Sequence, residues 1–143
     1  MSCVSFGGEG WLERLRAAAA DPRPVAAFLS PEVTDAKVRR VRLLAESHDP
    51  KIRESAALSY LAPPDLLTVL AADENPGVRC CVARNEHTPS DVLELLAADA
   101  DHGVRGWVAA NPVVPLTALE LLEADAEEMV RSLASWARGW ERT

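Results

Sequence analysis

Apolar and polar residues recur along this chain at one fixed spacing. An aliphatic residue followed by arginine occurs at Ile52-Arg53, Val78-Arg79, Val104-Arg105 and Val130-Arg131, in steps of 26 residues. The same step separates Leu44, Leu70, Leu96 and Leu122, and also Asp73, Asp99 and Asp125, and Pro63, Pro89 and Pro115. Coincident series at one spacing are the signature of an internal repeat, so the chain is predicted to consist of stacked units of 26 residues.

Each unit is predicted to contain two short helices. The first follows an Asp or Asn, as at Asp49-Pro50 and Asn75-Pro76, because such a side chain caps a free backbone N–H and proline is tolerated in the first turn. This helix spans only about two turns, so we expect it to be partly 3₁₀. We expect it to end at Asn85, since Asn tolerates the left-handed backbone conformation. The second helix starts near 88–91, another capping signature, and continues into a leucine-rich apolar face.

Neither helix can bury its apolar face alone, so neighbouring units have to stack and share a continuous core. The predicted organisation is a flexible leader at 1–10, degenerate N-terminal capping repeats at 11–48, regular repeats at about 49–74, 75–100 and 101–126, and a C-terminal capping helix at 127–143. Within the degenerate part, Asp35 to Glu46 is predicted to form a helix whose apolar face is Val38, Val41 and Ala45. The expected fold class is all-α.

The two central units carry a specific family pattern. The run Val78–Asn85 followed by Thr88-Pro89, and the run Val104–Pro112 followed by Pro115, resemble the leucine-rich repeat variant family. The resemblance covers roughly 49–140 and implies a right-handed α-solenoid of alternating α and 3₁₀ helices, related to HEAT and armadillo arrays. The unit is slightly longer than is usual for that family. Because Cys3 stands alone where some relatives have a cysteine cluster, no iron–sulfur centre is carried over.

Charged residues are distributed unevenly along the chain. The 143 residues are 48% hydrophobic and 26% charged, which is typical of a folded chain, and the net charge of −7 disfavours non-specific binding to nucleic acid or anionic membrane. Six cations lie between Lys37 and Arg53, whereas ten carboxylates and one cation, Arg105, lie between Glu86 and Glu128. This polarity predicts a partner chosen by charge complementarity. It leaves both a monomer and a weak head-to-tail self-association open.

Cysteine usage indicates a reducing compartment. Three cysteines form no disulfide framework, the first ten residues lack the features of a secretory signal, and no apolar run reaches the roughly 20 residues of a membrane span. We therefore expect a cytoplasmic protein with no membrane segment, cofactor or metal. Cys80-Cys81 is a candidate metal or redox site, but the repeat aligns Cys81 with Trp107 and Leu133, so we expect both Cys81 and Trp107 to lie in the core.

The arginine series is the most regular polar feature, and it has two interpretations. The members are Arg53, Arg79, Arg105 and Arg131. They either line one surface and bind a partner, or they pair with the aspartate series and with helix carbonyls, tying the units together. Asp73, Asp99 and Asp125 each precede an arginine by six residues, which favours the ladder.

The basic segment 37–53 is a second candidate. Arg39, Arg40 and Arg42 either form an electrostatic patch for an acidic protein, a phosphate or a nucleic-acid backbone, or form a solvated helix face compensated by nearby carboxylates. The second interpretation is favoured. No aromatic residue lies among these cations to stack on bases, so nucleic acid is an unlikely partner and remains the alternative.

Two further features stand out in a chain with only 5% aromatic residues. Trp136 and Trp140 are four residues apart and lie on one face of the last helix, where they either cap the array or anchor a partner. Asn85 and Asn111 either read a ligand in a groove or end the first helix of their units. The sequence contains no phosphate-binding loop, nucleophile elbow or zinc-protease motif. The predicted function is therefore a non-enzymatic protein–protein interaction scaffold.

Overall fold

A computed structural model describes the backbone of residues 33–140 and the side chains as far as Gly139. This part of the chain contains eight α-helices and no strand, as expected for an all-α protein. The helices are α3 (Asp35–Ala45), α4 (Pro50–Leu58), α5 (Pro64–Leu70), α6 (Pro76–Arg84), α7 (Ser90–Leu96), α8 (His102–Ala109), α9 (Leu116–Leu122) and α10 (Glu128–Trp140). The predicted leader at 1–10, and residues 11–32 of the predicted capping repeats, lie outside the described residues.

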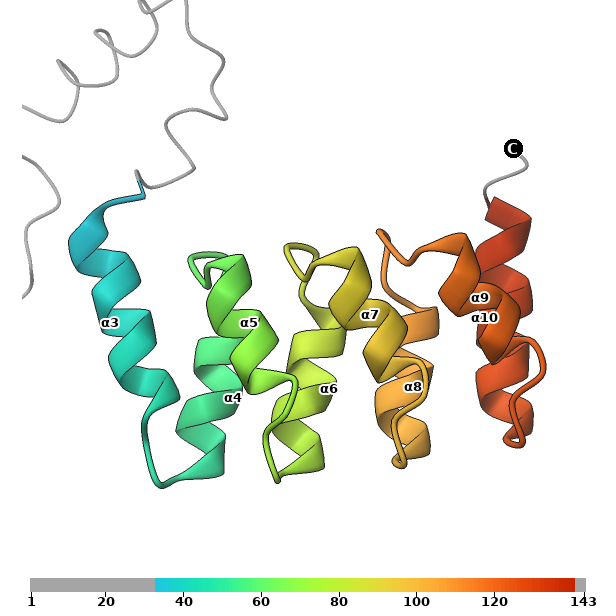
Figure 1. Ribbon diagram of the computed structural model, residues 1–143, viewed down its shortest axis with the longest axis horizontal. Helices are drawn as coiled ribbons and strands as arrows, with labels where there is room; N and C mark the ends of the chain where they lie inside the picture. Colours follow the sequence, from blue (N-terminus) through green and yellow to red (C-terminus); the bar gives the residue numbers. More distant parts are fainter. Residues whose placement is uncertain (1–32, 141–143) are drawn as a thin grey trace, which may run out of the picture. The chain divides into compact units, whose positions relative to one another are not determined.

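The helices after α3 form two layers. The longer helices α4, α6, α8 and α10 pack side by side in the first layer, and α3 packs against α4. The short helices α5, α7 and α9 form the second layer and lie in front of the first in Figure 1. Each first-layer helix thus packs against the first-layer helix of the neighbouring unit, and the stacked units share their interior.

The core between the layers is aliphatic. Leu67, Leu93 and Leu119 from the second layer are fully buried, and so are Val78, Val104 and Val130 from the first, each series in steps of 26 residues. Further leucines and valines complete this core, and small alanines among them allow close approach of the helices. Among the described residues, no aromatic side chain belongs to this core.

The caps of the first-layer helices follow the prediction. The side chains of Asp49, Asn75 and Asp101 accept hydrogen bonds from backbone N–H groups at the starts of α4, α6 and α8. The helix Asp35–Ala45 also lies where the sequence predicts it, with Thr34 as its cap and Val41 buried.

Three local predictions are wrong. The first-layer helices are α-helical, and the described residues contain no 3₁₀ segment, because tertiary packing along the whole layer supports the wider helix. The helix α6 ends at its cap residue Asn85 as predicted, but Asn85 adopts an extended backbone, φ −72° and ψ 125°, rather than a left-handed one. The second-layer helices begin after a proline with no side-chain cap, since the Thr88 hydroxyl donates instead to the Val82 carbonyl.

Candidate functional site

The arginine series forms bidentate ion pairs within each unit and hydrogen bonds to the unit before it. Arg79 donates from Nε and Nη2 to the two carboxylate oxygens of Asp99, at 2.8 and 3.0 Å. Its Nη1 donates backwards to the carbonyl of Asp73 at 2.8 Å. Arg53 pairs with Asp73 and Arg105 with Asp125 in the same way, with shortest distances of 2.7 and 2.6 Å.

Each aspartate therefore serves two arginines. The Asp99 carboxylate binds Arg79 of its own unit, its carbonyl accepts from Arg105 of the next, and Oδ1 also accepts from the backbone N–H of Asp101. Burial raises the pKa of Asp99, but these hydrogen bonds outweigh it and the pKa lies below its usual value. In Asp73 and Asp125 the arginine hydrogen bond is the largest influence, and it also lowers their pKa. The result is a continuous Asp–Arg ladder from Arg53 to Arg131.

The ladder decides between the two interpretations of the arginine series. Arg53, Arg79 and Arg105 are largely buried and direct their nitrogens to their own chain, as the structural interpretation expects. Arg131 continues the ladder through hydrogen bonds to the carbonyls of Asp125 and Ala126. The sequence spacing located the right residue types. The carboxylate partner lies 20 residues after Arg53, Arg79 and Arg105, and the aspartate six residues before an arginine binds it through its backbone carbonyl.

The buried asparagines form a parallel ladder. Asn111 donates from Nδ2 to the carbonyls of Ala83 and Asn85 in the preceding unit, at 2.7 and 3.1 Å, and accepts from the N–H of Val113. Asn85 makes the equivalent bonds to Ala57 and Ser59 one unit earlier. An extended backbone is needed for this reach, which explains why Asn85 is not left-handed. Both residues therefore hold neighbouring units together.

The basic segment is partly neutralised by its own chain. Arg42 pairs with Asp65 of α5 at 2.8 Å, and Lys51 pairs with Glu54 at 3.0 Å. Arg39 donates to the carbonyl of Asp35, and Arg40 is exposed. The compensating carboxylate for Arg42 comes from the next helix pair and not from the flanking sequence. This geometry gives the nucleic-acid alternative no additional support.

One register position holds side chains of very different burial. Cys81 is buried as expected, and burial raises the pKa of its thiol. Trp107 occupies the equivalent position in the next unit, yet its side chain is 43% exposed, so the prediction that it lies in the core is wrong. The position faces the edge of the core, where a small thiol fits and a large indole extends outwards.

The exposed Trp107 belongs to a row of surface aromatics. Tyr60 and Trp136 are 51% and 59% exposed, so every aromatic side chain that the structure describes lies on the surface. All three project from the first layer or from the turn that follows a first-layer helix. The guanidinium of Arg84, from α6, lies 4.4 Å from the centre of the Trp107 ring, a cation–π contact that fixes both side chains.

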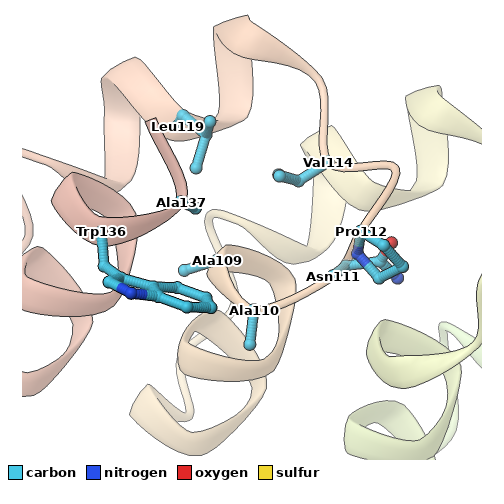
Figure 2. A pocket seen from close by; sticks show the side chains of 8 residues that line it. All are labelled: Ala109, Ala110, Asn111, Pro112, Val114, Leu119, Trp136 and Ala137. Atoms are coloured by element: carbon cyan, nitrogen blue, oxygen red, sulfur yellow. The ribbon is translucent and has the colours of Figure 1, made fainter. Parts of the chain in front are cut away.

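Two adjoining hollows run along this row. The first, of about 240 Å³, is lined by residues that include Leu58, Tyr60, Arg84 and Pro112. The second, of about 300 Å³, shares Pro112 and reaches Trp136. In Figure 2 the indole of Trp136 extends from α10 towards Ala110 at the end of α8. We call Tyr60, Arg84, Trp107, Pro112 and Trp136 the aromatic row.

Sequence reasoning found one member of the aromatic row and missed four. Trp136 was a candidate, whereas the side chain of Trp140 lies outside the described residues. The repeat register carries a signal for one of the four, Arg84. Leu58, Arg84, Ala110 and Trp136 stand 26 residues apart and differ in size and charge, unlike the buried series. A position that varies within a regular repeat is free of the packing constraints that hold the core series constant.

Within the described part of the chain, no three His, Cys, Asp or Glu residues converge in a way that would hold a metal ion. None of the described helices combines the length and the apolar character needed to cross a membrane.

Comparison with known proteins identifies one repeat unit. Residues 76–101 match the model of the leucine rich repeat variant family. The matched stretch begins at the first residue of α6, contains the whole of α7 and ends before α8, so it covers one helix pair with its turns. No curated protein and no solved structure matches the chain. The chain therefore carries a leucine rich repeat variant unit, as the sequence resemblance implied.

Proposed function

We propose that this leucine rich repeat variant chain is a non-enzymatic protein-interaction scaffold whose partner binds along the aromatic row. The observation that carries the proposal is the exposure of Tyr60, Trp107 and Trp136 in a domain whose described core contains no aromatic side chain. Aromatic rings are costly to leave in water and are enriched at protein–protein hot spots, together with arginine. Their position indicates a surface reserved for binding.

The shape of the row favours a protein segment over a small molecule. The two hollows are shallow, share Pro112 and extend from the end of α4 to α10, so a ligand that contacts both has to be elongated. Trp107 and Arg84 are already held together before binding, which lowers the entropy that a partner has to overcome. The array thus presents a preformed surface across several units.

The repeat organisation underlies this proposal. We propose right-handed stacking of 26-residue units at 49–74, 75–100 and 101–126, between N-terminal capping repeats and α10 as the C-terminal cap. Ladder contacts that recur at Arg53, Arg79 and Arg105, and a family match 26 residues long, support this unit. We also propose a cytoplasmic location and charge steering by the basic and acidic halves. Light scattering at low and high salt distinguishes a monomer from a weak head-to-tail assembly.

Affinity capture with matched variants tests the proposed surface. Full-length chain immobilised at one end is incubated with a lysate of the native host, and retained proteins are identified by mass spectrometry. We expect a protein that binds the wild type, and that the Trp107→Ala/Trp136→Ala variant loses by at least about tenfold. Met129→Ala is the control, because Met129 is 69% exposed on α10 but lies outside the aromatic row.

A partner retained equally by both variants and the wild type would exclude the aromatic row as its binding surface. A mobility-shift titration with duplex DNA and RNA at low salt is run in parallel. Complex formation there would favour the nucleic-acid alternative. We expect none, because Arg42, Lys51 and Arg53 are paired with carboxylates and the net charge of the chain is −7.

A further inference from the structure

The second layer exposes one aliphatic side chain per helix at the same repeat position. Val69 of α5, Leu95 of α7 and Leu121 of α9 are 69%, 66% and 51% exposed, and they stand 26 residues apart. A single exposed leucine is ordinary on a protein surface, but a regular series on adjacent helices is not. We call these three residues the outer stripe.

Side-chain contacts connect neighbouring helices beside the outer stripe. Arg42 of α3 pairs with Asp65 of α5, and Glu94 of α7 accepts a hydrogen bond from Thr117 of α9. In both pairs the two residues are 23 apart and occupy equivalent repeat positions. The first pair bridges α3 and α5, and the second bridges α7 and α9. Leu95 directly follows the bridging residue Glu94, so it lies beside the contact between α7 and α9.

The surface next to Leu121 is hollowed. An open hollow of about 360 Å³ lies between the ends of α7 and α9, and Leu121, Ala98 and Ala124 contribute to its lining. A partner side chain that enters this hollow would contact the last residue of the outer stripe. The C-terminal end of the outer stripe therefore borders a hollow rather than a flat surface.

Charge in this layer has a single sign. The helices α5, α7 and α9 contain Asp65, Asp91, Glu94 and Glu120 and no Lys or Arg. Asp91, Glu94 and Glu120 are exposed residues. Asp65 is paired with Arg42 at 2.8 Å, and Glu120 lies 3.9 Å from Arg138 of α10. Leu43 continues the apolar spacing on α3, but there it is flanked by the cations of that helix. An acidic, apolar surface therefore spans α5 to α9.

We propose that the outer stripe binds a basic amphipathic helix of a partner protein, which lies across α5, α7 and α9. Packed helices stand roughly 10 Å apart, and seven residues of an α-helix rise about 10.5 Å. A crossing helix with apolar residues at i, i+7 and i+14 would place one beside each stripe residue, while Lys or Arg between them meet the carboxylates. This surface lies in the other layer from the aromatic row, so it stands independently of the proposed function.

The probe is a synthetic 22-residue helical peptide of Ala and Lys with Leu at positions 4, 11 and 18, labelled with fluorescein. Fluorescence anisotropy against the full-length chain is expected to show saturable binding that weakens as salt is raised. The Leu95→Ala/Leu121→Ala variant should bind at least about tenfold more weakly. Both side chains are exposed, so unchanged circular dichroism and Tm verify that the variant folds.

Matched controls separate the parts of the proposal. Met129→Ala removes an equally exposed side chain from the first layer and should bind the peptide like the wild type. Glu94→Gln/Glu120→Gln should weaken binding and reduce its salt dependence. A peptide with Glu in place of every Lys should not bind.

Three results would overturn the proposal. One is an absence of saturable binding by the wild type, and another is equal binding by the Leu95→Ala/Leu121→Ala variant. The third is a concentration-dependent dimer, in analytical ultracentrifugation of the wild type, that the same variant abolishes. That result would assign the outer stripe to a second copy of this chain.

Discussion

The two layers of the array differ in how regular the side chains at their exposed repeat positions are. In the first layer, one register position holds an aliphatic residue in two units, a cation in one and an aromatic ring in one, namely Leu58, Ala110, Arg84 and Trp136. In the second, the outer stripe repeats an aliphatic side chain on every helix. A surface that varies along its length defines one binding register for a partner. A surface that repeats is matched by a partner that is itself periodic, so the two layers are suited to different kinds of ligand.

The interior that joins the layers is shared. The ladder arginines come from first-layer helices, and their aspartates follow second-layer helices, so each ion pair connects the two layers. Loss of a ladder contact should therefore disturb both surfaces together, whereas a change on one surface should leave the other intact. Variants of the ladder and of the surfaces test this distinction.

The largest effect is expected from Asp99→Ala. The change leaves the largely buried guanidinium of Arg79 without its carboxylate and should lower the free energy of unfolding by about 2 kcal/mol. Chemical denaturation monitored by circular dichroism measures it. Glu86→Ala is the control, because Glu86 is an exposed carboxylate that takes no part in the ladder. If Asp99→Ala were as stable as the wild type, the conclusion that the ladder links the two layers would be wrong.

Acid should weaken the same link in the unmodified protein. The pKa values of Asp73, Asp99 and Asp125 are lowered in the folded state, so these carboxylates stabilise the fold as long as they are ionised. Their contribution is complete above about pH 5 and is lost as pH falls through about 4 and below. Denaturation midpoints between pH 7 and pH 3 measure the loss. Asp99→Asn should show a shallower decline, and an identical slope would contradict the assignment.

The sequence correctly predicted the parts of the structure that repeat. The 26-residue series located the helix pairs, the Asn and Asp caps, and the residue types of the ladder, because each repeated position has one structural task. It failed for contacts between residues far apart in the sequence, both within a unit and between units. The partner of Arg79 is 20 residues away and the carbonyls bound by Asn111 are 26 and 28 residues back, distances that only stacking geometry defines. Trp107 was wrongly predicted to lie in the core. The repeat register gives the direction of a side chain, but not whether the space there is large enough for it.

The smallest effect on stability is expected from Trp136→Ala, which tests whether this residue caps the array or anchors a partner. A tryptophan that closes the end of the core would cost about 3 kcal/mol or more on truncation, as buried aromatic residues do. Because the side chain is 59% exposed and borders an open hollow, we expect a loss below about 1 kcal/mol. Thermal and chemical unfolding of the variant measure this difference. A small loss combined with weaker partner binding supports the anchor. A loss near 3 kcal/mol would instead make Trp136 part of the fold, and the aromatic row would then end at Pro112.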